Sequence, residues 1–131
     1  MEPTAAPTQP QRKVLIIEDE QFISELYVRA LTRAGYSATV EVDGQRGLVL
    51  AQSNTFDIIL LDLMVPTITG IDILHRLRGP GTPPLKAKIV ITTNLEQREG
   101  VHTEIEKQAD AYLVKAEITP RELVDFLNTI K

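Results

Sequence analysis

Side chains that could do chemistry stand at the ends of four short apolar runs in this 131-residue chain. They are carboxylates, hydroxyls and one ammonium: Glu18 and Asp19 of the triplet Glu18-Asp19-Glu20, then Asp62, Thr92-Thr93 and Lys115. Three carboxylates at close quarters are unstable without a cation. Oxygen ligands without cysteine or paired histidines suit a hard ion, above all Mg²⁺, which keeps several waters and recruits phosphate oxygens.

An aspartate carboxylate can also act as a nucleophile toward a phosphoryl group and form an aspartyl-phosphate. That reaction needs little beyond positioning and charge neutralisation. Lys115 could supply positive charge, and a threonine hydroxyl could hydrogen-bond a phosphoryl oxygen. The residues therefore predict that Glu18 and Asp19 hold the metal ion and that Asp62 receives the phosphoryl group.

Five strand-like runs alternate with helix-like stretches and must position these groups. The expected strands are Lys13–Ile17, Tyr36–Val42, Phe56–Asp62, Lys88–Thr93 and Ala111–Val114. The expected helices cover about 22–34, 44–52, 70–78, 97–108 and the stretch after Thr119. Regular alternation of this kind predicts a doubly wound α/β fold, a parallel sheet with helices on both faces. Ligands of such sheets bind outside the carboxyl ends of the strands, so the four groups are expected to share one site.

Two helix ends are marked by capping residues. Gly35 follows the last apolar position of the first helix, where a C-terminal cap belongs. Thr119, Pro120 and Glu122 have the types and spacing of a capping box with proline at the first helical position.

The composition is that of one soluble globular domain, with 43% hydrophobic and 24% charged residues. The net charge of −4 argues against direct nucleic-acid binding. Residues 1–12 contain three prolines and no apolar signal-peptide core, and they are expected to form a disordered leader. No apolar run is long enough to span a membrane, so a cytoplasmic protein is expected.

Four segments together resemble the receiver domain of bacterial two-component response regulators: "VLIIEDE", "DIILLDLMVPTITG", "IVITTN" and "DAYLVK". The resemblance covers residues 13–131, the expected receiver domain. It implies a flavodoxin-like five-stranded sheet of order 2-1-3-4-5. It also implies a phosphorelay switch that is not an enzyme and catalyses only its own phosphorylation and dephosphorylation.

The resemblance assigns roles to individual residues. It makes Asp62 the phosphoacceptor and a ligand of Mg²⁺, with Asp19 a direct ligand and Glu18 a ligand through water. The backbone carbonyl of Met64 would complete the metal site, and Lys115 would pair with the phosphoryl group.

In the same family a hydroxyl at the end of the fourth strand and an aromatic residue on the fifth respond to phosphorylation. The aromatic residue is Tyr112. The hydroxyl belongs to Thr92 or Thr93, and a slip of one residue would place it on the opposite face. Thr93 lies 22 residues before Lys115, a separation that resembles the family's, and it is preferred here.

Two positions depart from the family pattern. Ala116 stands where a cis proline usually follows the lysine, so the loop is expected to be either trans and reshaped, or strained. Asn94 stands where a small residue usually follows the switch hydroxyl, which leaves the lifetime of the phosphorylated state open.

The resemblance implies a histidine kinase or phosphotransfer protein as phosphodonor, a downstream protein target and scope for a phosphorylation-dependent homodimer. Two other functions compete with this one. A metal-dependent phosphatase would carry a second acid two residues after the nucleophile, where this chain has Met64. A pseudo-receiver would keep the fold as an interaction module that works without phosphorylation.

Overall fold

The structure is a computed structural model, and it describes residues 11–94, 105 and 107–130. Its centre is a parallel five-stranded sheet of order β2-β1-β3-β4-β5. The strands are β1 (Lys13–Ile17), β2 (Ser37–Glu41), β3 (Ile58–Leu61), β4 (Lys88–Thr93) and β5 (Ala111–Val114). The predicted fold class and strand order are therefore confirmed.

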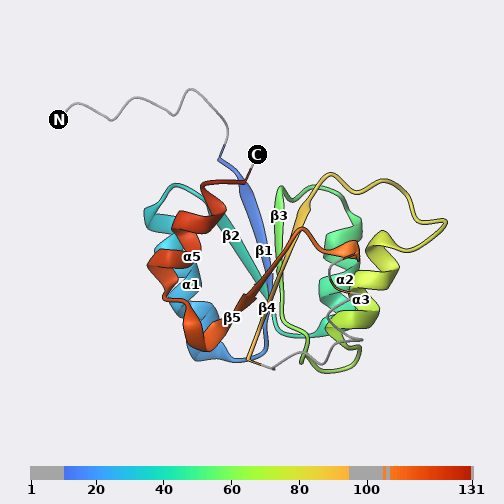
Figure 1. Cartoon of the computed structure of the whole chain (residues 1–131), viewed down its shortest axis with the longest axis horizontal. Helices are drawn as coiled ribbons and strands as arrows, with labels where there is room; N and C mark the ends of the chain where they lie inside the picture. The colour runs from blue at the N-terminus through green and yellow to red at the C-terminus, as the bar shows by residue number, and fades with distance from the viewer. Residues whose placement is uncertain (1–10, 95–104, 106, 131) are drawn as a thin grey trace.

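Helices cover both faces of the sheet (Figure 1). In the described residues these are α1 (Gln21–Arg33), α2 (Gly44–Gln52), α3 (Gly70–Arg78) and α5 (Pro120–Leu127). Helices α1 and α5 pack side by side on one face, and α2 and α3 pack on the other. None of the helices in the described ranges is both long and apolar enough to cross a membrane.

Strand side chains alternate between two apolar cores. Leu15, Ile59 and Ile89 face the core formed with α2 and α3. Their neighbours Val14, Ile58 and Val90 face the core formed with α1 and α5. Burial on both faces explains why the central strands read as continuous apolar runs.

Most element bounds match the sequence predictions. The observed β2 and β3 are shorter at both ends than the predicted runs Tyr36–Val42 and Phe56–Asp62. The helix expected over about 97–108 lies mostly outside the described residues, and so does nearly all of the leader expected over 1–12. The domain boundary between residues 12 and 13 stays a prediction.

Both predicted caps are present. Gly35 adopts a φ of 94°, a conformation that residues with a side chain rarely adopt. The Thr119 hydroxyl accepts from the amide of Glu122, and the Glu122 carboxylate accepts from the amide of Thr119. This capping box fixes the start of α5, five residues after Lys115.

The start of α3 lies against the backbone of the third strand's carboxyl end. A Cβ on Gly70 would lie 2.4 Å from the carbonyl oxygen of Asp62 and 2.6 Å from the Cα of Leu63. The Gly70 amide donates to the carbonyl of Leu63 at 3.0 Å. Only glycine permits this approach, so α3 helps to set the position of residue 62.

Candidate phosphoacceptor site

The candidate site lies where β1, β3 and β5 end, at the lower edge of the sheet in Figure 1. Glu18 directly follows β1, Asp62 directly follows β3 and Lys115 directly follows β5. The parallel ladders continue past the strand ends, because the Asp62 amide donates to the carbonyl of Ile17 at 3.1 Å. The sheet therefore brings together side chains that are 97 and 53 residues apart in the sequence.

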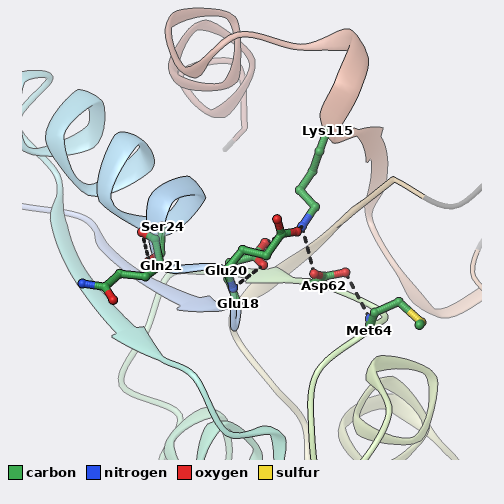
Figure 2. Close-up of polar contacts among 7 residues, drawn as sticks. All are labelled: Glu18, Glu20, Gln21, Ser24, Asp62, Met64 and Lys115. Carbon is green, nitrogen blue, oxygen red and sulfur yellow. Dashed lines mark hydrogen bonds and ion pairs between the residues drawn. The ribbon is translucent and has the colours of Figure 1, made fainter.

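The Lys115 ammonium is the centre of the site (Figure 2). Its Nζ donates to Glu18 Oε1 at 2.7 Å, to Asp62 Oδ2 at 2.9 Å and to Glu20 Oε1 at 3.3 Å. The side chains of Lys115, Glu18 and Asp62 are at most 4% exposed, whereas that of Glu20 is 56% exposed. Two of the three ion pairs are therefore screened from water.

Burial and neighbouring charges shift the pKa values of Glu18 and Lys115. Burial raises the pKa of Glu18 to about 7, although hydrogen bonds from Lys115 and from the Glu20 amide oppose the rise. Burial alone would lower the pKa of Lys115, but its hydrogen bonds to Glu18 and Asp62 outweigh burial and raise it. Lys115 is therefore firmly held as a cation.

The second oxygen of Asp62 is also bonded. Asp62 Oδ1 accepts from the backbone amide of Met64 at 3.0 Å. The Met64 side chain is 61% exposed and points away from Lys115 (Figure 2). Both oxygens of the expected phosphoacceptor thus have fixed orientations, and Met64 itself lies beside it.

At the end of β1 the structure brings Glu20 into the carboxylate cluster, whereas the sequence analysis predicted Asp19 beside Glu18. Oxygens of Glu18, Glu20 and Asp62 lie within 4.8 Å of one another. Asp19 is exposed and is not part of this group. Glu20 was missed as a site residue, and the only signal for it was its place in the carboxylate triplet.

The two threonines of β4 lie on opposite faces of the sheet. Both are buried, with Thr92 2% and Thr93 0% exposed. Thr92 pairs in register with Leu113, which packs in the core with α1 and α5. Thr93 lies two residues after Ile91, on the same face of the strand, and Ile91 and its register partner Tyr112 pack in the core with α2 and α3. Thr93 therefore shares a face with Tyr112.

The loop after Lys115 is trans. The peptide bonds of the described residues contain no cis bond, and Lys115–Glu117 form a short 3-10 helix. Of the two alternatives that Ala116 left open, the trans and reshaped loop is the one observed. Lys115 still reaches Asp62 from it.

The donor set of the site fits a hard divalent cation. It offers carboxylate oxygens from three residues around a point already occupied by a positive group, the Lys115 ammonium. Oxygen-only ligands of this kind are the ones that Mg²⁺ takes in proteins. The acidic cluster of Glu18, Glu20 and Asp62 therefore has the chemistry of a magnesium site.

Comparison with known proteins agrees with this geometry. A model of the response regulator receiver domain matches residues 14–128. The chain belongs to this family. A receiver domain of two-component signalling is not a conventional enzyme, and its acidic pocket with Lys115 is consistent with a phosphoacceptor site.

Among curated relatives, the receiver is similar to response regulator ArlR of Staphylococcus haemolyticus, with 40% identity over 78% of this chain. The match covers 45% of that relative, so the chain spans less than half the length of the curated relatives it matches. A solved receiver domain of Francisella response regulator 1452 has a TM-score of 0.78 at 28% identity, over 91% of this chain and 95% of that one.

A second solved structure carries a modified aspartate. It is a response regulator protein from Burkholderia pseudomallei with a phosphorylated aspartic acid, a calcium ion and citrate. Its TM-score is 0.73 at 24% identity, over 92% of this chain and 67% of that one. At that identity the match shows the shared fold.

Proposed function

We propose that Asp62 is the phosphoacceptor of this receiver domain and takes its phosphoryl group from a phosphohistidine of a histidine kinase or phosphotransfer protein. The observation that carries the proposal is the 2.9 Å contact between Lys115 Nζ and Asp62 Oδ2 inside a buried acidic cluster. In the transfer, an Asp62 oxygen forms a bond to phosphorus as the bond from phosphorus to nitrogen breaks. The other ring nitrogen of the phosphohistidine carries a proton, so when the first nitrogen keeps the electron pair of the broken bond, the ring leaves as neutral imidazole.

The proposed magnesium site lies at the same edge of the sheet, with Glu18, Asp19, Asp62 and the backbone carbonyl of Met64 as its ligands. Bound Mg²⁺ would supply charge neutralisation for the negative phosphoryl oxygens. Lys115 would neutralise a further negative charge, since its raised pKa keeps it protonated at neutral pH. Two buried carboxylates without such cations would repel an incoming phosphoryl group.

The proposed output is a conformational change that Thr93 and Tyr112 report to a downstream protein target. Their placement on one face of the sheet supports this pairing and favours Thr93 over Thr92. A domain of this kind shifts between two existing conformations when phosphorylation favours one of them. We propose a cytoplasmic location and no direct binding of nucleic acid by this domain. Whether phosphorylation produces a homodimer is a further outcome to test.

The decisive experiment is incubation with a small phosphodonor such as acetyl phosphate and Mg²⁺, followed by intact-mass measurement. The wild-type chain should gain one phosphoryl group, and Asp62→Asn should gain none. Asp72→Asn is the matched control, because Asp72 is an exposed aspartate in the first turn of α3 and lies outside the cluster.

The result also separates the receiver from its main competitor. Labelling of Asp62→Asn at the wild-type rate would refute the assignment of the phosphoacceptor. Absence of labelling in the wild-type chain with both acetyl phosphate and phosphoramidate would favour the phosphorylation-independent interaction module instead.

A further inference from the structure

Glu20 stands apart from the other members of the acidic cluster. It occupies the N-cap position of α1, yet its side chain makes no capping hydrogen bond. Its carboxylate instead contacts Lys115 Nζ at 3.3 Å. Its own amide donates to Glu18 Oε2 at 3.0 Å, which fixes the backbone of residue 20 beside the buried pair.

Lys115 has as many carboxylate partners as it has N–H donors. A lysine ammonium has three N–H donors and no acceptor. Lys115 has three carboxylate partners, so each donor is engaged. A phosphoryl oxygen on Asp62 can be bonded by Lys115 only when one of these partners is released.

Glu20 is the partner that is easiest to release. Its contact is the longest of the three, at 3.3 Å against 2.7 and 2.9 Å. Its side chain is 56% exposed, so water can solvate the carboxylate once the contact breaks. Glu18 and Asp62 are 1% and 4% exposed, and release of either from Lys115 would leave a buried charge without its cation, which is costly.

We propose that Glu20 is a positioning residue that occupies the third donor of Lys115 until a phosphoryl oxygen replaces it, and so slows phosphorylation of Asp62. The inference rests on the proposed phosphoacceptor function. The contact holds Lys115 at the mouth of the site before transfer, and it is the one of the three contacts that gives way to the phosphoryl oxygen.

The test compares Glu20→Gln, Glu20→Asp and Glu25→Gln at saturating Mg²⁺ with acetyl phosphate. Glu20→Gln removes the ion pair and a charge, whereas Glu20→Asp keeps the charge and shortens the side chain away from Lys115. Glu25→Gln is the matched control, because exposed Glu25 on the same helix accepts from Gln21 and makes no contact with Lys115. Both Glu20 variants should be phosphorylated about two- to five-fold faster, the size expected from one partly exposed ion pair. Glu25→Gln should match the wild type.

A second readout needs no phosphoryl transfer. The NMR resonance of the Lys115 ammonium, without added metal, should shift in both Glu20 variants and stay unchanged in Glu25→Gln. An unshifted resonance, or a Glu20→Gln rate equal to the wild type, would overturn the role of Glu20. An equal acceleration in Glu25→Gln, or a Glu20→Asp rate equal to the wild type, would assign the effect to overall charge and would also overturn it. Failure of the proposed function itself is a different result, namely a wild-type chain that is never labelled.

Discussion

Lys115 and Glu18 form a 2.7 Å ion pair in which both side chains are at most 3% exposed. They come from strands β5 and β1, which are not neighbours in the sheet, and Asp62 at the end of β3 lies between them as the second buried partner of Lys115. The pair therefore ties the edge of the sheet to its centre. Removal of Lys115 would leave the buried carboxylates of Glu18 and Asp62 without a cation, whereas removal of Glu18 would leave Lys115 paired with Asp62.

Lys115→Met should lower the free energy of unfolding by about 3 kcal/mol at neutral pH, because Glu18 and Asp62 lose their shared cation in a buried setting. Urea unfolding followed by circular dichroism measures this change. The control is Lys86→Met, since Lys86 is exposed and its nearest carboxylate oxygen, on Asp57, is 3.9 Å away. That variant should stay within about 0.5 kcal/mol of the wild type. Equal effects of the two substitutions would contradict a structural role for the buried pairs.

The stability of the metal-free protein should depend on pH through Glu18. Its pKa in the folded protein, about 7, lies above the ordinary value of 4.5, so the folded state binds this proton more tightly than the unfolded state. The free energy of unfolding should therefore fall as the pH rises from about 4.5 to about 7, and this contribution should be constant above that range.

Urea unfolding across this pH range tests the assignment with two variants. Glu18→Gln should lack the downward slope, and Glu25→Gln should keep it. Added Mg²⁺ should reduce the slope in the wild type, because a bound cation favours the ionised carboxylate. A slope that survives in Glu18→Gln would place the titrating group elsewhere.

Gly70→Ala should impair both stability and phosphorylation. The new Cβ would meet the backbone of Asp62 and Leu63, which cannot rotate away as a flexible side chain could. We expect a loss of about 1–3 kcal/mol, as for other overpacked sites, and slower labelling of Asp62. Gly81→Ala is the control, because Gly81 has a φ of 81° with nothing within 4 Å of its added Cβ. It should cost stability through backbone strain and leave the labelling rate unchanged.

Thr93→Val and Thr92→Val should separate the two buried hydroxyls. Each substitution removes a hydroxyl and nearly conserves the shape of the side chain. Thr93→Val should still be phosphorylated, but the NMR signals of the Tyr112 ring should no longer respond. Thr92→Val should keep the response, because its side chain faces the core with α1 and α5. The reverse pattern would make Thr92 the switch residue.

The fold was predictable because local signals and global packing agree. The predicted bounds of three elements equal the observed ones, because strong periodicity, turns and caps mark their ends: β1 (Lys13–Ile17), α3 (Gly70–Arg78) and β4 (Lys88–Thr93). The shorter strands β2 and β3 show where apolar character continues beyond the hydrogen-bonded ladder.

The details of the site were less accessible from the sequence. Asp62, Glu18 and Lys115 could be placed together because parallel strands end at one edge. The side-chain directions of Asp19 and Glu20 depend on the turn into α1, and no residue pattern specifies that turn. The backbone of Thr67 was equally unpredictable. Its φ is 76°, a value that β-branched residues rarely adopt and that no sequence rule assigns to threonine.

The strand order holds the carboxylates of the site more firmly than its ammonium group. Glu18 and Asp62 extend from β1 and β3, which are each flanked by strands on two sides, whereas Lys115 extends from β5 at the rim of the sheet. A protein that bound β5 and displaced it would move the Lys115 ammonium toward or away from Asp62 while Glu18 and Asp62 stayed in place. If binding of that protein changes the equilibrium for phosphorylation of Asp62 by some factor, phosphorylation must change the affinity for that protein by the same factor.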